Sequence, residues 1–214
     1  LCDIDSVRNE EVASWVTDDG RAPPAMYGRH ETDFVRMCET EEMDLVFTAT
    51  PWEWHVPVCV SAMGNGKHAA TEVPAAYTTD DCWRLVEYAE KHQKHCVMME
   101  NCNYDRPEMM VFHMARLGLF GDILHAECGY LHDLREIKFS ETGEGLWRRA
   151  HSMVRNGNLY PTHGLGPVAN VMDINRGDQF EYLVSMSSPS QGLQEWAVAS
   201  YPEDHLKRGE RYVL

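Results

Sequence analysis

The sequence predicts an α/β protein that begins with a parallel sheet and its crossover helices, and three observations support this prediction. Short apolar runs alternate with segments of helical periodicity along the first half of the chain. Each apolar run is followed by polar residues, as at the carboxyl ends of buried strands. Hydrophobic residues make up 43% of the 214 residues, which suffices for a packed core. This order of elements is typical of strand–helix–strand units.

The first predicted elements occupy residues 1–63. Residues 1–5 have the pattern of the end of a buried strand, and a polar helix follows until Gly20. Residues 44–50 form a continuous apolar run, which is typical of a strand covered on both faces. An apolar helix over residues 56–63 then leads back to the start of the next strand.

Two further strands complete the predicted sheet. Residues 68–73 form one strand, and Thr79 is the predicted cap of the amphipathic helix that follows it. Residues 96–101 form the other, before a helix over residues 107–118. Ligands of parallel sheets bind outside the carboxyl ends of the strands. The polar or aromatic residues predicted at that edge are Asp3, Trp52, Glu53, Trp54, His55, Glu72 and Asn101.

The pattern changes after Gly121. Residues 123–130 and 179–187 have the pattern of longer strands, which predicts an α+β domain with an antiparallel or mixed sheet. We therefore predict two domains, over residues 1–120 and 121–214. Because the chain ends within a pattern, we expect the second domain to be incomplete.

Charge and cysteine content exclude several functional classes. The formal net charge is −15, which disfavours nucleic acid and anionic membranes as partners. No apolar run is long enough to span a membrane, and no signal peptide is visible. Seven cysteines without a Cys-x-x-Cys pair indicate reduced thiols, and His92 and His95 lie among lysines, so we expect no metal site.

The segment 158–168 combines titratable side chains with rigid backbone. Tyr160 and His163 lie three residues apart, beside Pro161 and two glycines. An imidazole exchanges protons near neutral pH, whereas a phenol mainly donates a hydrogen bond. On the residues alone, this pattern fits a catalytic pair or a turn before a core helix equally well.

The chain resembles the two-domain Gfo/Idh/MocA oxidoreductase superfamily, and within it the NAD-dependent α-N-acetylgalactosaminidases of glycoside hydrolase family 109. The segment 158–167 carries this resemblance most specifically, and 52–55, 72–74 and 100–101 support it. The resemblance implies a Rossmann-like first domain whose first strand and Gly-x-Gly-x-x-Gly turn are missing before Leu1. Glu72-Val73-Pro74 has no lysine where dehydrogenases of the superfamily usually carry one, which favours the glycosidase branch.

The resemblance also implies roles for individual residues. Those implied to bind NAD are Asp3, Trp52, Glu53, Trp54, His55, Glu72, Val73, Asn101 and Tyr160. Those implied to bind the sugar are Tyr130, Arg148, Tyr160, Pro161, Thr162 and His163, with Arg149 as the alternative to Arg148. Proton transfer is assigned to His163, assisted by Tyr160 or Tyr130. Asp3 without a nearby arginine favours NAD over NADP.

Several residues of the predicted site, and two of their neighbours, also have a purely structural interpretation. Trp52 and Trp54 could pack between domains, and His55 could cap a helix. Glu72 and Asn101 could bond strand-end amides, and Glu100 is either a solvated carboxylate or an accessory catalytic group. Asp5 is interpreted as a helix cap rather than a ribose ligand.

The expected function is hydrolysis of a terminal N-acetylated sugar from a small molecule or glycan. The alternatives are an NAD(P)-dependent sugar oxidoreductase and a non-catalytic sugar- or cofactor-binding domain. The resemblance further suggests bacterial export and a homo-oligomer formed through the second domain, while the compartment stays open.

Overall fold

The computed structural model describes residues 1–214 and contains two compact units, Leu1–Met99 and Glu100–Leu214. This division lies before the predicted boundary at residue 120. The reason is that helix α5 (Arg106–Arg116) packs against helix α8 (Thr162–Val171) and so belongs to the second unit. No helix has both the length and the apolar character needed to cross a membrane.

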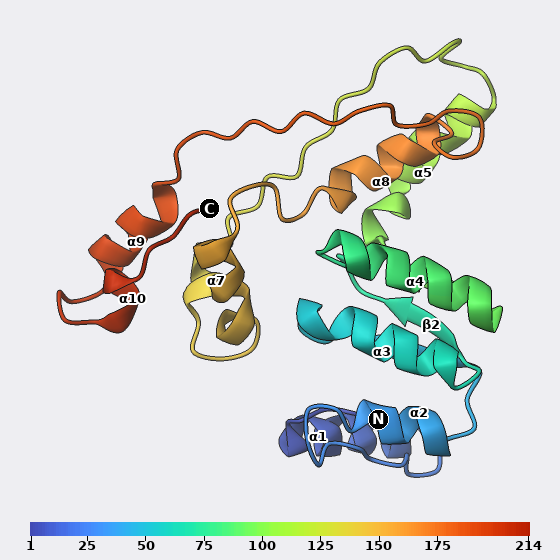
Figure 1. Ribbon diagram of the computed structural model, residues 1–214, viewed down its shortest axis with the longest axis vertical. Helices are drawn as coiled ribbons and strands as arrows, with labels where there is room; N and C mark the ends of the chain where they lie inside the picture. Colours follow the sequence, from blue (N-terminus) through green and yellow to red (C-terminus); the bar gives the residue numbers. More distant parts are fainter. The chain divides into compact units, whose positions relative to one another are not determined.

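The first unit is built on a parallel three-stranded sheet in the order β1-β2-β3, whose central strand β2 is labelled in Figure 1. The strands are β1 (Leu45–Thr48), β2 (His68–Thr71) and β3 (Cys96–Met98). Helix α3 (Trp52–Gly64) connects β1 to β2, and α4 (Thr79–His92) connects β2 to β3. The prediction of a parallel α/β fold is confirmed.

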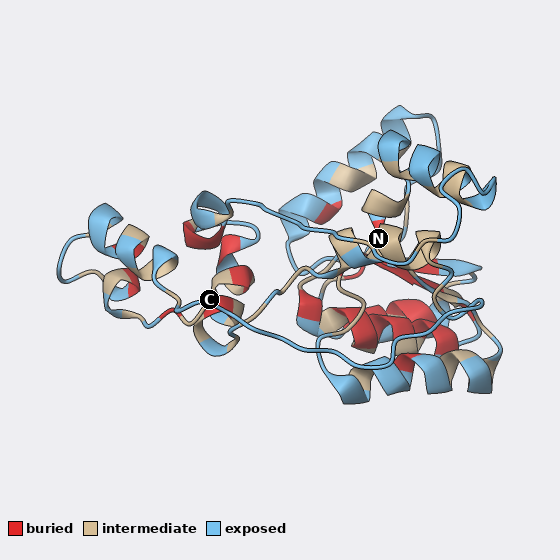
Figure 2. Cartoon of the chain, turned by 90° about the horizontal axis from the view of Figure 1, so that it is seen from above, coloured by how far each residue is buried: buried red, intermediate tan, exposed pale blue.

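Helix α3 forms the centre of the hydrophobic core. Its side chains Val56, Cys59, Ala62 and Met63 are buried, because α3 packs on β1, β2 and α4. Figure 2 colours the buried residues of the chain red. Burial of such apolar area contributes roughly 25 cal/mol per Å² to stability. The cap of α4 is Thr78, one residue before the predicted Thr79, and its hydroxyl accepts a hydrogen bond from the Asp81 amide.

Strand β1 is covered on only one face, contrary to the prediction from its continuous apolar run. Val46 and Thr48 are buried, whereas Leu45 and Phe47 are 52% and 54% exposed. Because α3 covers one face of β1, the alternate side chains of the strand stay exposed.

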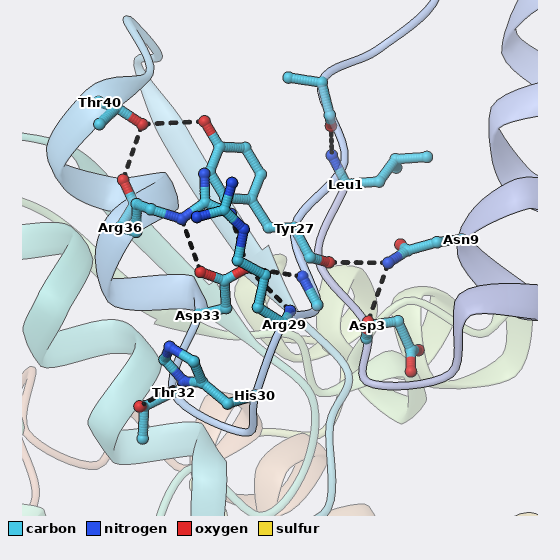
Figure 3. A network of polar contacts seen from close by, with 12 residues as sticks. Leu1, Asp3, Asn9, Tyr27, Arg29, His30, Thr32, Asp33, Arg36 and Thr40 are labelled. Carbon is cyan, nitrogen blue, oxygen red and sulfur yellow. Dashed lines mark hydrogen bonds and ion pairs between the residues drawn. The ribbon is translucent and has the colours of Figure 1, made fainter.

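Residues 1–3 pair with residues 25–27 and do not join the three-stranded sheet (Figure 3). Asp5 caps helix α1 (Ser6–Asp18) by accepting from the amides of Val7 and Arg8, so the interpretation as a helix cap is confirmed. The paired segment is held by Asn9, whose amide donates to the carbonyl oxygens of Asp3 and Tyr27 at 2.9 and 2.7 Å.

A buried carboxylate fixes the turn that follows Tyr27. Asp33 is 1% exposed and accepts from the amides of Gly28 and Arg29, at 2.7 and 3.1 Å. The Arg36 guanidinium, on helix α2 (Phe34–Thr40), donates to both carboxylate oxygens at 2.7 Å, as Figure 3 shows. The hydrogen bond from Arg36, followed by the two backbone donors, holds the pKa of Asp33 well below its ordinary value.

We expect Asp33→Asn to lower the melting temperature by several degrees at pH 7. Because the pKa of Asp33 is depressed in the folded protein, its contribution is present above the unfolded pKa of about 3.9 and is lost as the pH falls below it. The melting temperatures of wild type and variant, followed by circular dichroism, should therefore approach each other progressively as the pH falls below about 4. Asp19→Asn, in an exposed ion pair with Arg21, is the matched control. A pH-independent difference would contradict this assignment.

The second unit consists of helices and extended segments. Its elements are η1 (Asn101–Asn103), α5, α6 (Arg135–Phe139), α7 (Gly145–Val154), α8, α9 (Gly192–Ser200) and α10 (Leu206–Gly209). One apolar cluster is formed by Phe139, Ala197 and Tyr212, with Trp196 and Tyr201 against it. The Lys207 ammonium donates to the Phe139 carbonyl at 2.8 Å beside this cluster.

The two strands predicted in the second unit are not formed. Residues 123–130 and 179–187 are extended chain without a paired neighbour (Figure 1). Their apolar side chains are open to solvent: Leu124 is 90% and Leu183 is 85% exposed. An alternating apolar pattern marks a segment able to pair, but a strand forms only where a second strand supplies hydrogen bonds.

Candidate functional site

The carboxyl ends of the three strands meet at one edge of the first unit. Thr48 pairs in register with Thr71, and Thr71 with Met98. The turns that follow β1 and β2 therefore leave the sheet at the same edge, which is where parallel sheets bind ligands. The predicted residues Trp52 to His55 and Glu72 to Val73 lie in or just after these turns.

His55 joins the two turns. It is 1% exposed, with Nδ1 at 2.7 Å from the Pro74 carbonyl and Nε2 at 2.8 Å from the Thr50 carbonyl. A neutral imidazole donates to only one of these acceptors. His55 thus links the turns after β1 and β2 and is not the helix cap of the alternative interpretation, since the capping position is Pro51.

The neighbouring aromatic residues are packed within this unit. Trp52 is 3% exposed at the first position of α3, and Trp54 makes an edge contact with Phe34 at 5.9 Å between ring centroids. Val73 is buried, whereas Glu53 is exposed and Glu72 is half-buried. The Glu72 carboxylate receives only a long contact, at 3.4 Å, from the Val73 amide.

Two further features of the first unit are suited to a polar or charged ligand. No side chain caps the N-terminus of α3, and the N-terminal end of a helix attracts negative charge. The Asp3 side chain is exposed, and only Oδ1 is used locally, by the Asp5 amide at 2.8 Å. Such a carboxylate suits the vicinal hydroxyls of a ribose.

The second unit brings together the titratable residues of the 158–168 segment. Pro161 occupies the capping position of α8, and Thr162 and His163 are its first two residues. His163 Nδ1 lies 2.7 Å from Glu100 Oε1, and the two side chains are 10% and 1% exposed. An imidazole hydrogen-bonded to a buried carboxylate is an arrangement suited to proton transfer.

Aromatic rings surround the imidazole of His163. The Tyr160 ring stacks on it, with an angle of 10° and 5.2 Å between centroids. The Tyr130 ring meets it edge-on at 4.6 Å and lies 5.9 Å from the Tyr160 ring. The structure therefore brings Tyr130, Tyr160 and His163 into one cluster, although Tyr130 is 33 residues before His163 in the chain.

Arg148 completes the cluster. It is 8% exposed on α7, and its Nη1 donates to the Tyr160 hydroxyl at 2.5 Å while Nη2 pairs with Glu144 at 2.7 Å. Arg149 instead forms an ion pair with Glu210. Of the two arginines that the sequence left open, Arg148 is thus the one in contact with Tyr160.

The other predicted residues of this unit lie around the cluster. Asn101 is exposed at the first position of η1, directly after Glu100. The Thr162 hydroxyl is buried and makes no hydrogen bond within the protein. A buried hydroxyl of this kind can accept or donate one bond to a ligand or to water.

The glycine of the motif at position 166 allows α8 to approach η1. A Cβ added at Gly166 would lie 2.9 Å from Glu100 Cγ and 3.0 Å from Asn103 Oδ1. Any larger side chain would push α8 away from the carboxylate that holds His163. Gly166 is therefore a structural partner of Glu100 and His163 that the sequence did not single out. From the sequence, Glu100 itself is interpreted as a solvated carboxylate or an accessory catalytic group, but its contact with His163 is not predicted.

Glu100, Cys102 and His163 offer three atoms that could bind a metal ion, all within 4.8 Å of one another. The 2.7 Å between Glu100 Oε1 and His163 Nδ1 is a hydrogen-bond distance. It is shorter than the separation of roughly 3.3 Å that two ligands of one tetrahedral ion at about 2.0 Å would have. Burial and the nearby Glu100 raise the pKa of Cys102, which favours the thiol over the thiolate that binds metals. The donor set thus fits a hydrogen-bonded pair better than a metal centre.

Comparison with known proteins assigns the two units. Residues 104–214, more than half of the chain, match the model of the glycosyl hydrolase 109 C-terminal domain. The chain belongs to glycosyl hydrolase family 109. Residues 2–100 of this family 109 chain match the model of the oxidoreductase family with an NAD-binding Rossmann fold. NAD is the cofactor of that fold, in agreement with the expectation from the sequence.

Relatives match the family 109 chain over its whole length. It is 47% identical to a glycosyl hydrolase family 109 protein of Shewanella pealeana and 44% identical to an α-N-acetylgalactosaminidase of Shewanella oneidensis, over 214 residues in each case. The match covers 47% of each of these proteins, so the chain spans about half the length of the curated relatives it matches.

Solved structures share the fold of the family 109 chain. An inositol dehydrogenase homologue from Azotobacter vinelandii, in complex with NAD+, has a TM-score of 0.61 at 20% identity, covering 79% of this chain and 44% of that one. A probable dehydrogenase from Thermotoga maritima has a TM-score of 0.59 at 17% identity, covering 80% and 47%.

Proposed function

We propose that the enzyme containing this chain is an NAD-dependent glycosidase that cleaves terminal α-N-acetylgalactosaminides. The observation that carries this proposal is the cluster of Tyr130, Arg148, Tyr160 and His163, in which an imidazole, two phenols and a guanidinium meet. The relative from Shewanella oneidensis that bears the name α-N-acetylgalactosaminidase supports the choice of sugar.

The imidazole of His163 is the proton carrier in this proposal. Because Nδ1 faces Glu100, Nε2 is the nitrogen that takes a proton from the C3 hydroxyl or from C2 of the sugar. Most glycosidases use two carboxylates that flank the scissile bond, and NAD-dependent families are exceptions to that rule. A positioned imidazole suits the exception because removing a proton next to a carbonyl group requires a base of moderate strength.

Arg148 and the tyrosines hold the sugar. The guanidinium of Arg148 is fixed by Glu144 and the Tyr160 hydroxyl, so that it presents a localised positive charge. Such a charge stabilises the negative oxygen that develops when C2 loses its proton. Tyr160 and Tyr130 offer phenol hydroxyls that orient the hydroxyl groups of the ring.

Bound NAD would supply reversible hydride exchange at C3 of the sugar, which leaves no net oxidation, so that the overall reaction is hydrolysis. In the first unit, the residues that would hold it are those after β1 and β2, together with Asp3: Trp52, Glu53, Trp54, His55, Glu72 and Val73.

The test uses a full-length enzyme that contains this sequence, loaded with NAD, and a chromogenic α-N-acetylgalactosaminide that carries deuterium at C2. We expect release of the chromophore, loss of the C2 deuterium to solvent and no accumulation of NADH. Release without loss of deuterium would show direct hydrolysis. NADH formed in proportion to sugar, without release, would show an oxidoreductase instead.

A further inference from the structure

Glu100 is a buried carboxylate with an unequal set of partners. Its Oε1 accepts two hydrogen bonds, from His163 Nδ1 at 2.7 Å and from the Cys102 amide at 3.1 Å. Its Oε2 is buried and has no hydrogen-bond partner in the protein. With 1% of its surface exposed, Glu100 is not the solvated carboxylate of the first interpretation.

A carboxylate without a solvent shell is stable only if nearby donors compensate for the lost hydration. The Cys102 amide is one donor, and it belongs to the same short helix, η1. The other donor is the imidazole of His163, 63 residues further along the chain. The position of Glu100 Oε1 therefore suits an imidazole that donates a hydrogen bond from Nδ1.

An ionised carboxylate only accepts hydrogen bonds, so the hydrogen of a neutral His163 ring must lie on Nδ1. Nε2 then carries the lone pair and is the basic nitrogen. When the ring takes up a proton, the carboxylate also stabilises the positive charge. One hydrogen bond thus selects the tautomer, the ring orientation and the charge state that a base requires.

We propose that Glu100 is a positioning residue for His163, which keeps Nδ1 protonated and directs Nε2 toward the sugar. This inference rests on the proposed function, in which His163 transfers the proton. The packing supports it: the space that a Cβ at position 166 would need lies against the Glu100 side chain, and Tyr160 stacks on the ring that Glu100 contacts. Glu100 itself does not touch the substrate in this scheme.

The first test compares Glu100→Gln and Glu100→Ala in the full-length, NAD-loaded enzyme with wild type. Glutamine keeps the size of the side chain and removes the charge, so we expect kcat to fall about 100-fold while KM changes less than about threefold. Alanine leaves a cavity beside the imidazole, and added formate should restore part of the lost activity. Glu203→Gln, an exposed glutamate in the same unit, is the matched control and should behave like wild type.

The second test observes the imidazole directly. Nitrogen-15 NMR of histidine-labelled enzyme, with the His163 signal identified by its loss in His163→Gln, distinguishes the two tautomers. We expect hydrogen on Nδ1 in wild type and a shift toward hydrogen on Nε2 in Glu100→Ala, while circular dichroism shows a folded protein.

The outcomes separate this inference from the proposed function. If the NMR signals show hydrogen on Nδ1 in wild type and the expected shift in Glu100→Ala, but the enzyme has no glycosidase activity, the proposed function is rejected and the positioning role of Glu100 is retained. A wild-type ring with hydrogen on Nε2, or a Glu100→Gln variant with kcat within about twofold of wild type, would overturn the positioning role. So would one equivalent of metal that stays bound after dialysis against a chelator, because Glu100 and His163 would then be metal ligands.

Discussion

Replacing His163 by alanine in the full-length enzyme should reduce kcat for an α-N-acetylgalactosaminide by about 10²–10⁴-fold, the usual contribution of a general base. The reason is geometric, because the His163 imidazole contacts Glu100 and both tyrosine rings. KM should change little, since Arg148 and the two tyrosines stay in place to bind the sugar.

The measurement is steady-state hydrolysis of the chromogenic substrate, with bound NAD determined separately by release and absorbance. His113→Ala is the control, because His113 is exposed on α5 in the same unit. Near-normal turnover in His163→Ala would remove His163 from the mechanism. Loss of bound NAD in this variant would mean that the residue supports the cofactor and not the proton transfer.

Gly166→Ala should lower both thermal stability and turnover. The added methyl group would lie 2.9 Å from Glu100 Cγ and 3.0 Å from Asn103 Oδ1, so α8 or η1 must shift. Such overpacking costs about 1–3 kcal/mol, which outweighs the roughly 0.5–1 kcal/mol that alanine contributes over glycine inside a helix. Because the shift separates Glu100 from His163, we expect kcat to fall by about ten- to a hundredfold.

Gly192→Ala provides the comparison for this prediction. Gly192 begins helix α9, and nothing lies within 4 Å of the position that its Cβ would take. The melting temperature and kcat of the Gly192→Ala variant should therefore match or slightly exceed those of wild type. If Gly166→Ala were as stable and as active as Gly192→Ala, α8 would not need its close approach to Glu100.

The regular elements of the first unit could be predicted because local patterns determine them. The apolar runs at 44–50 and 68–73 contain β1 and β2, and the stripe after Thr78 forms α4. The pairing of residues 1–3 with Tyr27 could not be predicted, since no periodicity shows which segment supplies the hydrogen bonds. The same reason accounts for residues 123–130 and 179–187, which have strand-like patterns but no ladder.

The candidate site was predictable where one short motif carries it. Tyr160 and His163 lie in the same turn, and the resemblance to family 109 added Tyr130 and Arg148, which the structure brings to Tyr160. The contact between Glu100 and His163 joins residues 63 positions apart, so it has no signature in sequence spacing. Their roles in catalysis remain predictions.

The enclosure of the His163 ring has a stereochemical consequence. One face of the ring lies under Tyr160, Tyr130 contacts it edge-on, and Nδ1 is engaged by Glu100, which leaves the Nε2 edge to meet a substrate. Under the proposed cycle, one nitrogen therefore removes the hydrogen from C2 and delivers its replacement from the same side. The sugar keeps its configuration at that carbon, so the released product is a galactosamine derivative and not its C2 epimer.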